Sequence, residues 1–286
     1  MIRVLLALAA LISVLTTIGI VVALLNESLS FFSEVGTRFF TDASWSPLFE
    51  PAGFGIWQLL NGTFLITGIA ILVAIPVGLG SATYLSEYAT PRVRRIVKPV
   101  LEVLVGVPTV VFGYFALTFV TPVLLNDVLG LDVAIFNALA AGLVMAFMIV
   151  PTIASVSEDA MSAVPQGLRE GAYGLGATKR QVASRVIFPA AISGIVASIV
   201  LGVSRGIGET MIVLVAAGLQ PNFGVNPTEG FATITTFMGA TAKGDNPAGS
   251  IGYESIFACG LTLFVLTFAM NMVAIRFVRK HREVYE

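Results

Sequence analysis

The chain has 286 residues, of which 56% are hydrophobic and only 12% are charged, and its mean hydropathy is +0.92. This composition excludes an ordinary soluble globule, which carries about twice this share of charged residues, and a disordered chain, which has too few apolar residues to bury. A net charge of −1 provides no basic field for nucleic acid, and the single cysteine (Cys259) and single histidine (His281) exclude an intrachain disulfide and a Cys- or His-based zinc site.

Six apolar stretches are long enough to cross a membrane as helices, since one crossing takes about 20 residues. In chain order they are Val4–Leu25, Phe64–Tyr84, Val103–Leu125, Ala134–Val156, Ala190–Leu219 and Ile256–Phe277. Their apolar residues are continuous and do not alternate as they would in the strands of a membrane barrel. The first stretch has no clean small-residue cleavage site before Asn26, so we expect a retained helix and not a signal peptide. The sequence therefore predicts an all-α, polytopic membrane protein with six transmembrane helices in a single domain over residues 1–286.

The lysines and arginines predict how these helices are oriented. One set of connections carries Arg38 and Lys243, and the opposite set carries almost all the other basic residues. The basic set consists of Arg3, Arg92, Arg94, Arg95, Lys98, Arg169, Lys179, Arg180, Arg185, Arg276, Arg279, Lys280 and Arg282. Because basic loops stay in the cytoplasm, we expect both termini and the connection at residues 157–189 to be cytoplasmic.

Two of the outer connections are long. Residues 26–62 are rich in phenylalanine and tryptophan, which is typical of a segment lying in the membrane interface, and we favour this over a ligand-binding cage. Residues 221–255 contain an apolar patch, Phe231–Met238, that is too short to span. We expect this patch to lie on the surface or to dip part-way into the membrane.

The fifth stretch holds charges where the bilayer makes them costly. Arg205 lies at its middle, and Glu209 follows four residues later. A charge at mid-bilayer costs about 2.5–3.5 kcal/mol on insertion scales, so such residues usually face a cavity or a partner. On a continuous helix Arg205 and Glu209 would share one face and partly neutralise each other. We interpret Arg205 as the attractive charge for a passing anion and Glu209 as a limit on how tightly that anion is held. The alternative is a self-satisfied pair that packs two helices.

Hydroxyl groups near the same place are weaker candidates for contact with a solute, because hydroxyls in membrane helices more often bond to their own backbone. They belong to Ser204, Thr210 and Thr109.

The cytoplasmic connection at residues 157–189 is too long for a simple turn between helices. Pro165, followed by polar residues, predicts the start of a short helix, and Gly174 and Gly176 predict its end. Arg180–Ile187 predicts a second helix before Pro189. The first short helix would either rest on the bilayer or serve as a peg for a soluble partner.

Features of an enzyme are missing from the sequence. The run Gly174–Lys179 does not have the Gly-Lys-Ser/Thr order of a phosphate-binding loop, and no catalytic triad or metal-ligand spacing is present. We therefore expect a non-catalytic chain without a cofactor or metal of its own.

The segment Glu170-Gly171-Ala172, followed by Gly176 and then Val186–Pro189, resembles the EAA loop of ABC-importer permeases. The family pattern has Ala, Ile and Leu where this sequence has Gly171, Val186 and Phe188. Narrower features resemble the phosphate permeases of the PstC type, and the likeness runs roughly from the first span to the basic tail. These features are Tyr84–Tyr88, Gly106–Gly113, Val156–Ala160, Leu168–Glu170 and Gly208–Met211.

The resemblance implies a type I ABC-importer permease in the plasma (inner) membrane that moves inorganic phosphate into the cytoplasm. It implies that Arg205 and Glu209 take part in phosphate passage. It also implies three kinds of partner: a second permease (PstA-like), an ATPase dimer (PstB-like) that binds ATP and Mg, and an extracytoplasmic phosphate-binding protein (PstS-like). The ATPase-coupling residues that it implies are Arg169, Glu170, Gly171, Ala172 and Gly176.

Two alternatives stay open from the sequence. One is a permease of the same architecture for another oxyanion or a small solute. The other is a channel or secondary transporter that does not use ATP.

Overall fold

The computed structural model describes residues 2–244, 247 and 249–281, mostly as helices joined by short connections. Arg282, the side chain of Lys280 and residues 245, 246 and 248 of the outer connection lie outside the described residues. The helices in the six apolar stretches are α1 (Ile2–Val35), α3 (Trp57–Thr83, continued by the π-helical turn η1, Tyr84–Tyr88), α5 (Thr109–Phe115, continued by the π-helical segment η2, Ala116–Val128), α6 (Ala138–Ser162), α10 (Ile192–Ile207) and α13 (Ile251–His281). The other elements are α2 (Arg38–Thr41), β1 (Trp45–Ser46), β2 (Gly53–Phe54), α4 (Pro91–Val105), α7 (Gln166–Gly174), α8 (Lys179–Val182), η3 (Ala183–Ile187), α9 (Phe188–Ala190), α11 (Met211–Ala216) and α12 (Ile234–Thr241).

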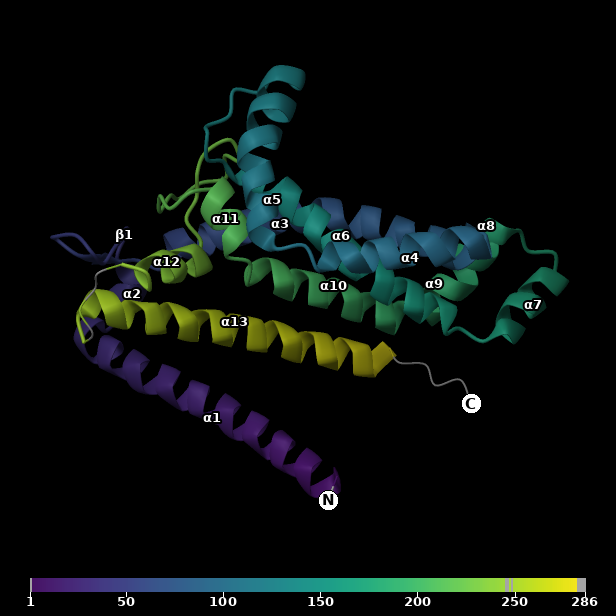
Figure 1. Cartoon of the computed structure of the whole chain (residues 1–286), viewed down its shortest axis with the longest axis horizontal. Helices are drawn as coiled ribbons and strands as arrows, with labels where there is room; N and C mark the ends of the chain where they lie inside the picture. Colours follow the sequence, from purple (N-terminus) through teal and green to yellow (C-terminus); the bar gives the residue numbers. More distant parts are fainter. Residues whose placement is uncertain (1, 245–246, 248, 282–286) are drawn as a thin grey trace.

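The structure supports a multi-span membrane protein. Within the described residues, five helices are long and apolar enough to cross a membrane, and a sixth crossing forms if 179–190 and 192–207, which meet at 73°, are one bent span. The α7–α8 end of the molecule lies at the opposite end of the long axis from β1, α2 and α12 (Figure 1). This arrangement matches a membrane domain with one cytoplasmic and one outer end.

Several spans extend beyond their predicted limits. The first helix continues through Asn26 to Val35, and the fourth continues through Glu158 to Ser162. A helix needs apolar side chains only where it meets lipid, so polar residues extend it on either side of the bilayer. The helix α6 therefore ends at Ser162, so residues 157–162, which were expected at the start of the connection, are helical.

The third predicted span begins too early, and the fifth is wrong as a continuous helix. In the third, α4 ends at Val105 and α5 begins after Pro108, which has no amide hydrogen and disfavours a helical residue before it. The helix α4 lies along α6, whereas α5 and η2 rise steeply away from it (Figure 1). In the fifth, α10 ends at Ile207, Gly208 caps it, and α11 begins at Met211.

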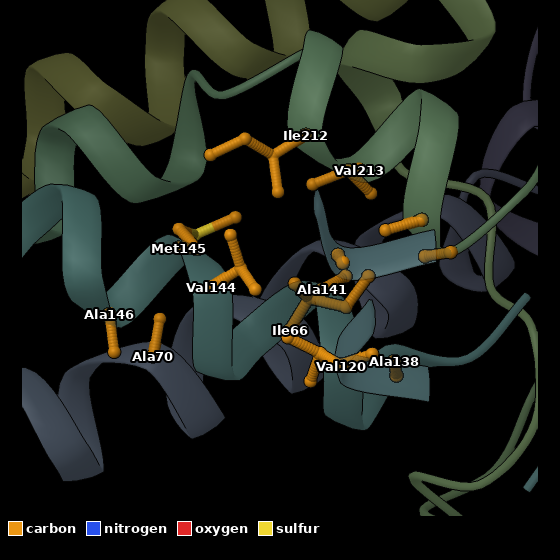
Figure 2. Close-up of a cluster of buried hydrophobic side chains, with 14 of the residues drawn as sticks. Ile66, Ala70, Val120, Ala138, Ala141, Val144, Met145, Ala146, Ile212 and Val213 are labelled. Atoms are coloured by element: carbon orange, nitrogen blue, oxygen red, sulfur yellow. The ribbon is translucent and has the colours of Figure 1, made fainter. Parts of the chain in front are cut away.

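The main core lies between α3 and α6, which pack more extensively than any other pair of elements in the described part of the chain. Small residues bring the two helices together: Ala70 faces Ala146, and a Cβ added to Gly142 would lie 2.7 Å from the Cβ of Ile69 (Figure 2). Ile212 of α11 and Val120 of η2 belong to the same cluster. The short helix α11 is thus held against the rigid centre of the molecule.

Part of the aromatic segment at residues 26–62 folds as a packed core, whereas Phe40, Phe49 and Trp57 are exposed. Phe31, Phe39, Trp45 and Phe54 are at most 4% exposed. Their rings meet edge to face, with centroids 5.8 Å apart for Phe31–Phe39 and 6.0 Å for Phe39–Trp45. The antiparallel strands β1 and β2, paired Trp45 to Phe54, bring two of these rings into the cluster.

Candidate functional site

Arg205 lies in the last turn of α10, and its side chain is half-buried. Its Nη1 donates a hydrogen bond to Oγ1 of Thr152 on α6, at 3.2 Å. Among the described residues, no carboxylate lies within ion-pair distance of the guanidinium. A full positive charge therefore lies in a membrane span with a neutral hydroxyl as its protein partner.

Glu209 does not pair with Arg205, and the predicted pair on one helical face is wrong. The helix ends between the two residues, so the geometry of positions four apart does not apply. Glu209 is 8% exposed, and its Oε1 accepts hydrogen bonds from the backbone N–H groups of Met211 (2.9 Å) and Ile212 (3.1 Å). Its own carbonyl accepts a hydrogen bond from Thr235 of α12 at 2.7 Å. Glu209 thus caps α11 and anchors the break in the span.

The patch Phe231–Met238 was expected on the surface or part-way into the membrane. Residues 234–238 of this patch form the start of α12, and Phe231, Ile234 and Thr236 are buried. The contact from Thr235 brings α12 to the break between α10 and α11. The outer connection therefore reaches the level of the candidate site.

The three hydroxyl candidates do not form one cluster around Arg205. Ser204 Oγ lies 3.5 Å from Asn271 Oδ1 and faces α13. Thr109 begins α5 and Thr210 precedes α11, and these two helices cross closely: a Cβ added to Gly113 of α5 would lie 3.0 Å from the carbonyl oxygen of Met211. Thr109 and Thr210 therefore stand beside a helix crossing, and Ser204 lies on a different face.

Residues that the sequence did not single out support this region. Thr152 is the partner of Arg205, and Thr67 of α3 lies against Gly206, where an added Cβ would be 3.1 Å from its Cγ2. A threonine in an apolar span is too common to carry a signal of its own. The neighbouring Pro151, which leaves a helix carbonyl free, was the one local irregularity in the sequence.

A second polar site lies at the end of α6 that leads to α7. Glu158 is 1% exposed and forms ion pairs with Arg94 and, at 2.8 Å, with Lys98, both from α4. Ser162 donates to the same carboxylate at 2.8 Å. Hydrogen bonds from Lys98 to Asp159 and Glu158 raise the pKa of the lysine above its ordinary value. The sequence placed Glu158 in a loop, but it is the buried anion that fastens α4 to α6.

The predicted pair of short helices between the fourth and fifth spans is confirmed, as α7 and then α8 with η3. Glu170 and Gly171 are exposed on α7, and Ala172 is half-buried. Gly176 adopts φ +80°, and the N–H of Ala177 donates to the carbonyl of Ala172 at 3.1 Å. A positive φ after a helix favours glycine, so Gly176 ends α7 in the expected way. Arg169, by contrast, turns inward, with its side chain 15% exposed.

Metal binding finds no support in the described ranges, where no three His, Cys, Asp or Glu side chains gather closely enough to hold an ion.

Residues 74–283 match the family model described as "Binding-protein-dependent transport system inner membrane component". The chain is 34% identical to the phosphate transport system permease protein PstC of Mesorhizobium japonicum, over 90% of this chain and 82% of that protein. It is 34% identical to PstC of Haemophilus influenzae, over 91% and 87%. It is also 31% identical to the probable ABC transporter permease protein YqgH of Bacillus subtilis, over 99% and 91%.

Solved structures show the same fold at lower identity. A chain of the inward-facing MetNI methionine ABC transporter superposes with a TM-score of 0.58 at 20% identity, over 80% of this chain and 95% of that one. A chain of a bacterial ABC transporter involved in alginate import superposes with a TM-score of 0.59 at 15% identity, over 94% and 98%.

Proposed function

The chain belongs to the family of inner-membrane components of binding-protein-dependent transport systems, and we propose that it is the membrane-spanning permease subunit of an ATP-driven importer of inorganic phosphate. It is a multi-pass, non-catalytic membrane subunit, and ATP is hydrolysed on a separate chain. The similarity to PstC proteins from two organisms supports phosphate as the solute.

The observation that carries the proposal is the uncompensated charge of Arg205. A guanidinium offers several N–H donors in a planar fork that matches the oxygens of phosphate. One of these donors binds Thr152, which leaves the others for an anion. Arg205 is also the only basic residue in α10 and α11.

The two ends of the molecule fit different partners. We place the α7 end in the cytoplasm with both termini, because the basic residues of α4 and α8 gather there. The exposed Glu170 and Gly171 of α7 would dock on an ATPase dimer (PstB-like) that holds ATP and Mg. An extracytoplasmic phosphate-binding protein (PstS-like) would deliver phosphate at the opposite end, and a second permease (PstA-like) would complete the path.

Reconstitution in liposomes tests the proposal. The chain is assembled with these candidate partners and supplied with labelled phosphate, sulfate, molybdate and phosphonate in turn. We expect ATP-dependent uptake of phosphate that the other oxyanions do not compete away. Uptake driven by the chain alone without an ATPase would contradict the ATP-driven function, and preferred uptake of another oxyanion would contradict the substrate.

A further inference from the structure

We propose that Arg169 is the positioning residue that transmits movement of α7 to the membrane spans, and that it does not itself dock on the ATPase. This inference rests on the proposed function, because it assumes that α7 receives force from a partner. It assigns different roles to two neighbouring residues of the same helix: Arg169 holds α7 to the spans, and Glu170 faces outward.

One guanidinium joins three elements. Nη2 of Arg169 donates to the carbonyl of Met161 at the end of α6 (2.8 Å) and to Oε1 of Glu87 in η1 (3.2 Å). Nη1 donates to the carbonyl of Val164 in the turn before α7 (3.2 Å). The Glu87 side chain is 6% exposed, so this ion pair is largely shielded from solvent. Such a pair holds its geometry better than an exposed one.

Both spans that Arg169 holds also contact the region of Arg205. Met161 lies nine residues after Thr152 on α6, about 14 Å along the helix axis at 1.5 Å per residue, and Thr152 is the hydrogen-bond partner of Arg205. The turn η1 continues α3, whose Thr67 lies against Gly206. Because α3 and α6 pack tightly along their length, a displacement of α7 moves together the residues that contact Arg205 and Gly206.

The contacts of Arg169 also leave room for a second arrangement. Its Nε is buried and has no hydrogen-bond partner within the described part of the chain. Buried donors are nearly always paired, and an unpaired one calls for an explanation. A shift of α7 that brings a hydrogen-bond acceptor to this Nε would be favoured. Arg169 would then have two stable sets of contacts, as a residue that transmits movement requires.

The test uses the full assembly of this chain with its ATPase, second permease and binding protein. Arg169→Met removes the hydrogen bonds to Met161, Val164 and Glu87. Arg169→Lys keeps the positive charge but loses the planar set of guanidinium N–H donors. Glu170→Lys changes the neighbouring residue that faces outward. Arg95→Met is the matched control, since Arg95 is an exposed arginine of the same cytoplasmic end. Three quantities are measured: retention of the ATPase in a pull-down, the rate of ATP hydrolysis, and phosphate taken up per ATP hydrolysed.

We expect Arg169→Met to retain the ATPase within about twofold while uptake per ATP falls about tenfold, which is within the usual range of coupling between distant sites. Arg169→Lys should fall between this variant and the wild type. Glu170→Lys should lose the ATPase, and Arg95→Met should match the wild type. Combining Arg169→Met with Glu87→Gln should add no further loss of coupling, because both changes break one shared contact.

The inference is overturned if Arg169→Met loses the ATPase in proportion to its loss of uptake, or if uptake per ATP stays at the wild-type value. Hydrogen exchange gives a readout that does not depend on the solute. We expect faster exchange of the α7 amides in Arg169→Met with unchanged exchange in α13, and unchanged α7 exchange also overturns the inference. Failure of the wild-type assembly to import phosphate would instead contradict the proposed function.

Discussion

Replacing Glu209 separates two roles for a carboxylate at a break in a membrane span. As a cap, Glu209 accepts hydrogen bonds from the N–H groups of Met211 and Ile212. As a charge partner, it would weaken the hold of Arg205 on an anion. Glu209→Gln keeps an oxygen acceptor and removes the charge, whereas Glu209→Ala removes both.

The contacts set the expected magnitudes. Loss of a capping side chain costs about 0.5–2 kcal/mol, and the N–H of Ile212, a fully buried residue, would be left without an acceptor at about 1–3 kcal/mol. We therefore expect Glu209→Ala to destabilise the protein by about 1.5–5 kcal/mol. Glu209→Gln loses the interaction of the charge with the helix dipole, about 0.3–1 kcal/mol.

Denaturant unfolding in detergent micelles and phosphate uptake by the reconstituted assembly measure the two effects. We expect Glu209→Gln to unfold near the wild type and to keep most of its uptake, and Glu209→Ala to lose both stability and uptake. If Gln is as damaging to uptake as Ala while its stability is normal, the negative charge is needed for transport and the capping role is insufficient.

Two further predictions concern the end of the molecule that carries α7. Glu158→Ala should destabilise the protein by about 2–4 kcal/mol, because it leaves Arg94 and Lys98 without their buried carboxylate, at a cost lowered by the partial exposure of both cations. Asp159→Ala removes an exposed carboxylate and should cost less than about 1 kcal/mol. Equal melting temperatures for the two variants would show that Glu158 does not hold α4 to α6. Gly171→Ala should stabilise α7 by about 1 kcal/mol, since an added Cβ meets nothing within 4 Å. Slower amide exchange in α7 of the isolated chain is the expected result, and faster exchange would contradict it.

The sequence was sufficient to locate the spans but not to find where they end or break. Apolar runs identify the parts of helices that meet lipid, and α1, α3, α6 and α13 were found in this way. Glu158 counted against a helix because its charge is costly in lipid, yet Arg94 and Lys98 from α4 neutralise it. Contacts between segments far apart in the chain leave no trace in local hydropathy.

The candidate site was predicted in part. Arg205 lies in the helix expected, but its relation to Glu209 was wrong because a helix was assumed to continue through Gly206-Ile207-Gly208. Three residues with two glycines favour a break, and a carboxylate after them fits a cap on the next helix. The exposed Glu170 and the terminating Gly176 match the predicted peg, whereas the inward turn of Arg169 depends on Glu87, which is distant in sequence.

The uptake of labelled phosphate by an assembly containing Arg205→Ala tests most directly whether the charge of Arg205 binds the anion during transport. Retention of the ATPase and a normal melting temperature must first show that the variant assembles. Uptake should then be abolished, while Arg205→Lys retains a fraction of it because the charge remains without the planar fork. Normal uptake of phosphate by a correctly assembled Arg205→Ala transporter would show that Arg205 serves helix packing and would contradict the account.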